Sequence, residues 1–65
     1  MSLKDLRNLS VQDLRKKEQD LRKELFILRI KKRVEGLKDI NQIRKTKRQI
    51  ARVLTVLRQK ELRSE

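Results

Sequence analysis

Seven basic residues and no acidic one lie between Ile40 and Lys60. Arg44, Arg48 and Arg52 are spaced four residues apart, so on a helix they form a row along one face. We call these three arginines the basic row. An arginine guanidinium can bind a phosphate group with two parallel hydrogen bonds, whereas a lysine attracts it as a point charge. The row therefore indicates salt-dependent binding to a phosphate backbone.

The same stretch has the pattern of an amphipathic helix. At about 100° per residue, its apolar side chains form one narrow stripe, made of Ile43, Ile50, Leu54 and Leu57. The basic row and Lys45 lie almost opposite that stripe. A solvated face usually mixes both signs of charge, and this face does not. We expect the apolar stripe to pack on protein and the basic face to contact nucleic acid.

A second basic group, formed by Arg29, Lys31, Lys32 and Arg33, precedes the single glycine. One or two cations at this position would compensate the dipole of a helix C-terminus, but four indicate nucleic-acid contact as well. The two groups could merge into one basic end of the molecule. The candidate nucleic-acid-binding residues are Arg29, Lys32, Arg33, Arg44, Lys45, Lys47, Arg48 and Arg52.

Helices must position these side chains, because the chain has no proline and only one glycine, Gly36. Ser2, Ser10 and Asp39 are the predicted N-caps, and Gly36 is the predicted left-handed C-cap. The caps predict a helical turn over 3–8, a long helix over 11–34, a link over 35–39 and a second long helix over 40–63. Two helices of equal length with a short link predict an all-α antiparallel hairpin, with residues 1–65 as a single domain.

Each long helix has a predicted seam of apolar residues. The seams consist of Leu14, Leu21, Leu25 and Leu28 in the first helix, and of Ile43, Ile50, Leu54 and Leu57 in the second. Several of these residues are seven apart, which predicts a gentle left-handed coil. With Leu54 in the seam, the substitution Leu54→Asp is expected to unfold the hairpin by burying a charge.

An apolar patch lies on the opposite side of the first long helix. It consists of Phe26, Ile27, Ile30 and Val34. A two-helix hairpin cannot cover both sides of one helix, so these residues are expected to be exposed and to contact a partner protein. Self-association, or cover by the N-terminal turn, would hide the patch equally well.

The composition excludes several classes of function. The net charge is +11, and the chain has no cysteine or histidine, so no thiolate metal site or histidine base is available. The acidic residues between Asp13 and Glu24 alternate with basic ones as on a solvated surface, and nothing predicts an enzyme, a cofactor or a bound metal. No apolar run is long enough to cross a membrane, and no secretory signal is legible, so a cytoplasmic protein is expected.

Several motifs, in this order and spacing, resemble a known family. They are Leu6-Arg7-Asn8-Leu9-Ser10, Leu25-Phe26-Ile27-Leu28-Arg29, Gly36-Leu37, and the run from Arg44 to Leu57 that contains Ile50-Ala51-Arg52. Together they resemble the bacterial large-subunit ribosomal protein family numbered twenty-nine over nearly the whole chain. The chain has Ile30-Lys31 where members often have an aromatic residue and glutamine, and its link also differs.

The resemblance implies a long helix pair bound to large-subunit ribosomal RNA at the rim of the peptide exit tunnel. A neighbouring ribosomal protein, and nascent-chain factors that dock there, are the implied protein partners, and no homo-oligomer is implied within the particle. Arg44, Lys47, Arg48 and Arg52 match the family's RNA-facing run. Phe26 and Arg29 match its Leu-Phe-x-Leu-Arg motif.

The residues alone leave other functions open. A free dimeric regulator, in which two hairpins form a four-helix bundle, would bind duplex nucleic acid without ribosomes; no helix with Asn or Gln placed for base reading supports it. A hairpin that binds only acidic proteins would have weak affinity for RNA even at low salt. A helix lying on a membrane surface is disfavoured, because the hairpin already buries the apolar stripe.

Overall fold

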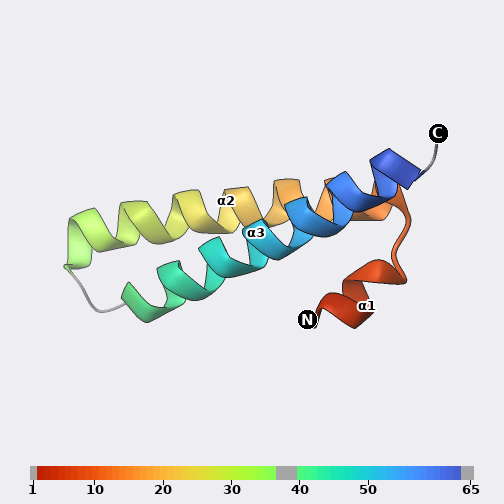
Figure 1. Ribbon diagram of the computed structural model, residues 1–65. Helices are drawn as coiled ribbons and strands as arrows, with labels where there is room; N and C mark the ends of the chain where they lie inside the picture. The colour runs from red at the N-terminus through yellow and green to blue at the C-terminus, as the bar shows by residue number, and fades with distance from the viewer. Residues whose placement is uncertain (1, 37–39, 64–65) are drawn as a thin grey trace.

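The computed structural model describes residues 2–36 and 40–63, which form three helices and no strand. They are α1 (Leu3–Arg7), α2 (Val11–Glu35) and α3 (Ile40–Arg63). Helices α2 and α3 run antiparallel along each other, and α1 folds back beneath the C-terminal half of α3 (Figure 1). The predicted all-α hairpin with a short N-terminal helix is confirmed. Helix α2 continues one residue beyond the predicted end at Val34.

Serine caps begin the first two helices. The Ser2 hydroxyl accepts the Asp5 backbone N–H at 3.3 Å, and the Ser10 hydroxyl accepts the Asp13 N–H at 3.1 Å. At the end of α2 the Gly36 N–H donates to the Lys32 carbonyl at 2.9 Å. The predicted cap at Asp39 and most of the link lie outside the described residues.

Gly36 ends α2 with a φ of 95° and a ψ of −159°. The positive φ agrees with the predicted glycine cap, but this ψ lies outside the left-handed helical region. The backbone instead adopts an extended conformation with positive φ that is essentially restricted to glycine.

The hydrophobic core has two parts that meet at Leu21 of α2, which packs against both. Near the link, the described part of the core is formed by α2 and α3, through Leu25, Leu28, Ile43 and Ile50. At the other end all three helices contribute, through Leu6, Leu14, Val53, Val56 and Leu57. Full burial of each such side chain stabilises the fold by roughly 1.5–3 kcal/mol, so α1 is an integral part of the packed structure.

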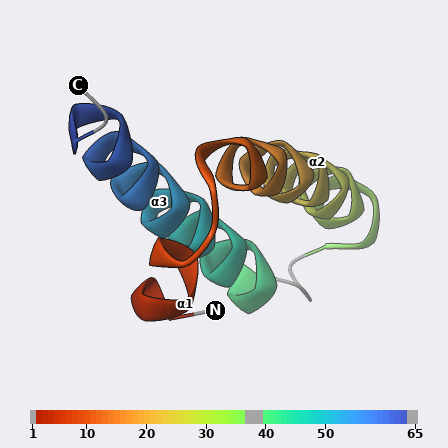
Figure 2. The same ribbon diagram turned by 90° about the vertical axis from the view of Figure 1, so that its right-hand side faces the viewer.

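The predicted seam of α3 is wrong at Leu54, whose exposed fraction is 38%. Val53 and Val56 are buried instead, with exposed fractions of 0% and 1%. The cause is α1, which packs mainly against α3 on a different side from α2 (Figure 2). This second contact rotates the buried stripe of α3 toward α1 and leaves Leu54 at its edge.

The structure reverses the expected effect of Leu54→Asp. An aspartate at this exposed edge stays hydrated, so we expect a loss of only about 1 kcal/mol in the free energy of unfolding, partly from the lower helix propensity of aspartate. Circular dichroism during thermal denaturation measures this loss. A variant without helical signal at room temperature would place Leu54 in the core after all.

Candidate nucleic-acid interface

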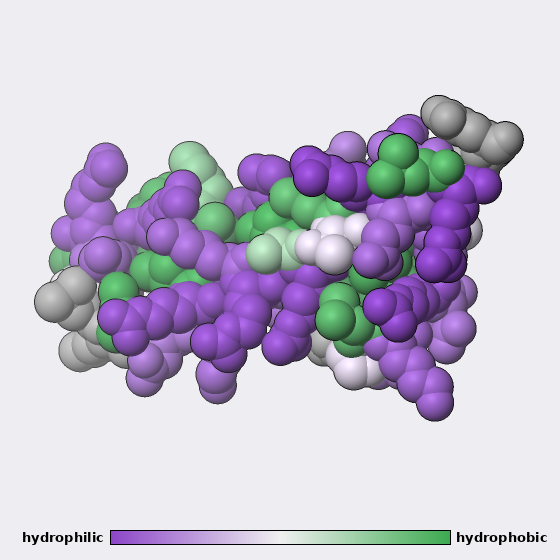
Figure 3. All heavy atoms as spheres, viewed as in Figure 1, coloured by the Kyte–Doolittle hydropathy of each residue, from purple (hydrophilic) through white to green (hydrophobic). Residues whose placement is uncertain are grey.

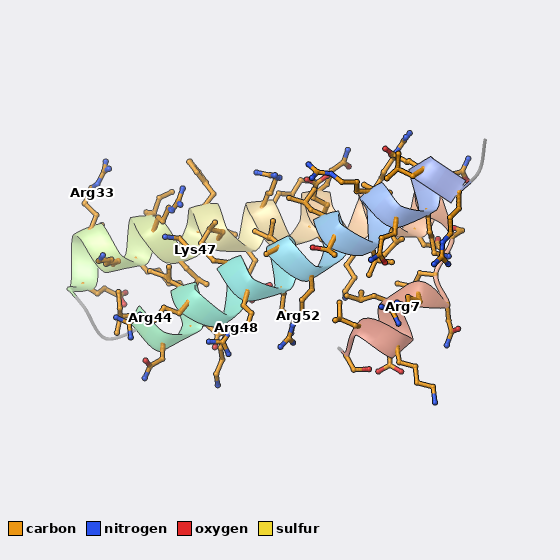
Figure 4. The ribbon with its side chains drawn as sticks, viewed as in Figure 1. Arg7, Arg33, Arg44, Lys47, Arg48 and Arg52 are labelled. Carbon is orange, nitrogen blue, oxygen red and sulfur yellow. The ribbon has the colours of Figure 1, made fainter. Side chains whose placement is uncertain are left out.

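The basic row lies along the edge of α3 that faces away from α2. Arg44, Arg48 and Arg52 all extend from that edge (Figure 4), because the buried residues of α3 occupy the other sides of the helix. The side chains of Arg44 and Arg48 are exposed, and Arg52 is half-buried. One helix carries all three, with about 6 Å along its axis from one arginine to the next.

The charges of the basic row are not neutralised within the described part of the chain. The ion pairs among residues 2–36 and 40–63 join Arg15 to Glu61 and Arg22 to Glu18, each at 3.0 Å. Neither pair involves the basic row. Cations held in line on a rigid helix suit the phosphate groups of a polyanion.

The two lysines near the row differ in position. Lys45 is exposed and adjoins Arg44 and Arg48 on the helix surface. Lys47 is also exposed, but it extends toward α2 (Figure 4). Only Lys45 therefore adds to the face that carries the basic row.

The cations at the end of α2 do not all lie beside the basic row. Arg33 extends from the far edge of α2, opposite the edge from which Arg44 extends (Figure 4), so Arg33 does not share a face with the basic row. Arg29, Lys32 and Arg33 line a shallow pocket of about 480 Å³ beside Gly36. Arg29 and Arg33 also border the apolar patch, because they line one pocket with Phe26 and Ile30.

The apolar patch is exposed, as predicted. The exposed fractions of its side chains range from 48% for Ile30 to 78% for Val34, so neither α1 nor α3 covers it. A second exposed apolar pair, Leu54 and Leu62, lies on α3. Figure 3 shows hydrophilic side chains over most of one face, with hydrophobic ones along the line where α2 and α3 meet. Such exposed apolar surface is typical of an interaction site.

A third group of cations was not identified from the sequence. Arg7, Lys60 and Arg63 line a groove of about 410 Å³ between α1 and α3, together with Val11, Val56 and Gln59. We call it the α1–α3 groove. The sequence could have indicated Lys60, because it follows Arg52 by eight residues, which is two further steps of the four-residue spacing. Arg7 had no such signal, because its place depends on how α1 packs.

These features define a small, strongly basic helical hairpin with a row of arginines that no ion pair compensates among residues 2–36 and 40–63. The described residues contain no cluster of metal-binding side chains, and none of their helices is long and apolar enough to cross a membrane. Comparison with known proteins then gives the family. The model of the ribosomal L29 protein family matches residues 4–60, and the chain belongs to that family.

Curated relatives agree with this assignment. The chain is 53% identical to the large ribosomal subunit protein uL29 of Hydrogenobaculum sp. (strain Y04AAS1), over 92% of this chain and 91% of that protein. It is 52% identical to uL29 of Aquifex aeolicus (strain VF5), over 97% of this chain and 86% of that protein. No solved structure is significantly similar. Membership of the ribosomal L29 family confirms the resemblance seen in the sequence. It also confirms the ribosomal localisation that the resemblance implied.

Proposed function

We propose that this protein is a structural constituent of the large ribosomal subunit and binds large-subunit ribosomal RNA through the basic row. The observation that carries the proposal is the line of Arg44, Arg48 and Arg52 along one edge of α3, which forms no ion pair with the part of the chain that the structure describes. Its relatives in Hydrogenobaculum and Aquifex are named as large-subunit proteins, which supports the same assignment.

The mechanism is electrostatic and geometric. Arginines on one rigid helix neutralise phosphates where RNA segments come close together, and the hairpin fixes their spacing. The only aromatic side chain is Phe26, so the protein has no platform on which bases could stack. Shape and backbone contacts, rather than base identity, then determine where it binds. RNA also relieves the self-repulsion of a chain with a net charge of +11.

The remaining candidate residues have supporting roles in this proposal. Lys45 contacts RNA beside the row, and Lys47 contacts it from the side of α3 nearer α2. Arg29, Lys32 and Arg33 contact it at the link end of the hairpin. The apolar patch packs against a neighbouring ribosomal protein, because its side chains stay exposed in the isolated chain. A position at the rim of the peptide exit tunnel, where nascent-chain factors dock, follows from the family resemblance.

Sedimentation of a lysate of the source cells tests the proposal. We expect the protein to sediment with large subunits, at one copy per particle, and to dissociate only at high salt because phosphate contacts weaken as salt rises. Quantitative mass spectrometry of the gradient fractions measures its ratio to other large-subunit proteins. A small soluble dimer, absent from the particles at moderate salt, would refute the proposal and favour a free regulatory coiled coil.

A further inference from the structure

The basic row continues along α3 beyond Arg52, with one interruption. Steps of four residues lead from Arg52 to Val56 and then to Lys60. Each step advances about 6 Å along the axis and about 40° around it, so the row winds slowly across the helix surface. Val56 is uncharged and has an exposed fraction of only 1%. A row built from α3 alone would therefore have a gap at this position.

Helix α1 covers this gap and brings a cation to it. Leu6 is completely buried in the same core cluster as Val53 and Val56, which fixes α1 against α3. The next residue, Arg7, then lines the α1–α3 groove beside Val56 and Lys60. Figure 4 shows Arg7 between α1 and α3, on the side of α3 from which the basic row extends. An arginine from α1 thus stands where α3 has a valine.

The groove has the chemistry of an anion site. Three of its six lining residues, Arg7, Lys60 and Arg63, are cationic, and none is acidic. Neither ion pair among the described residues involves these cations. Val11 and Val56 form an apolar part of the groove wall. Water screens the attraction between opposite charges less strongly beside such a wall. The Gln59 amide adds a neutral hydrogen-bond donor.

We propose that Arg7, Lys60 and Arg63 bind neighbouring phosphates of the RNA backbone and extend the basic row across the junction of α1 and α3. This inference rests on the proposed RNA binding and assigns α1 a part in it. One RNA strand would contact Arg44, Arg48 and Arg52 on α3, then Arg7 on α1, then Lys60. Helix α1 thereby turns a row of three cations into a site that spans most of α3.

The test is binding of the full chain to protein-free large-subunit ribosomal RNA, measured by filter retention over a range of salt concentrations. The variant Arg7→Gln with Lys60→Gln removes two charges and keeps much of each side chain. We expect about tenfold weaker binding at moderate salt and a salt slope shallower by about 1.5, since each lost phosphate contact removes roughly 0.7–0.9 from the slope. The charge-preserving variant Arg7→Lys with Lys60→Arg should retain the wild-type slope.

The matched control is Lys16→Gln with Lys23→Gln, which removes the same charge from exposed positions on the outer face of α2. It should leave the slope unchanged. If the groove variant binds like this control, the groove is not an RNA site, even while Arg48 and Arg52 prove necessary. If substitutions in the basic row also have no effect, the proposed function itself fails.

The helical circular dichroism signal of each variant verifies that its fold is intact. The charge-preserving variant distinguishes the loss of charge from a displacement of α1.

Discussion

Replacing Val53 with aspartate should abolish the helical fold of the isolated chain. Val53 is completely buried, in the cluster where Leu6 of α1 and Leu14 of α2 meet α3. A buried carboxylate without a partner costs several kcal/mol, and that cluster supplies it with no cation. Small domains have a total stability of only about 5–15 kcal/mol, and a 65-residue chain lies toward the low end.

Leu54→Asp is the matched control, since it places the same charge on the next residue of the same helix. Far-ultraviolet circular dichroism and thermal denaturation should show a helical, cooperatively melting Leu54→Asp variant and a largely unfolded Val53→Asp variant. Equal stability of the two would mean that α1 does not seal the core over Val53. The reverse order would restore the stripe expected from the heptad spacing.

This pair also shows where the sequence sufficed to predict the fold. The serine caps, the single glycine and the heptads of α2 are local features, and they predicted the helices to within a residue or so at their ends. The buried side of α3 depends on a contact with α1, which lies far away in the sequence. If α3 packed only against α2, its buried stripe would include Leu54. Because α3 packs against both α2 and α1, its buried stripe includes Val53 and Val56 instead.

Parts of the candidate nucleic-acid interface could be predicted from the sequence, and other parts depend on how the helices pack. The exposure of the apolar patch and the alignment of Arg44, Arg48 and Arg52 follow from helical periodicity, so the sequence predicts both. The separation of Arg33 from Arg44 depends on how the two long helices face each other in space, and the residue pattern left it open. Arg7 had no periodic relation to α3 at all, because it lies on another helix.

The second large effect is expected from Arg48→Ala combined with Arg52→Ala. Both arginines lie on the edge of α3 away from α2, and neither belongs to the core clusters. Alanine favours helix, so the fold should be retained. Loss of two charge-assisted contacts to phosphate, each contributing about 1.5 kcal/mol, should weaken binding to large-subunit ribosomal RNA about a hundredfold. The salt slope should become shallower by about 1.5.

Two companion variants identify what the arginines contribute. Lys16→Ala with Lys23→Ala removes the same charge from the outer face of α2 and should bind almost like the wild type. Arg48→Lys with Arg52→Lys keeps the charge but loses the two-donor geometry, so its salt slope should match the wild type while its affinity falls. If the affinity depended only on the total charge, and fell equally when α2 or α3 lost two cations, the interaction would be nonspecific attraction to a chain of net charge +11. Only a loss confined to the arginine positions identifies this edge of α3 as the surface that contacts RNA.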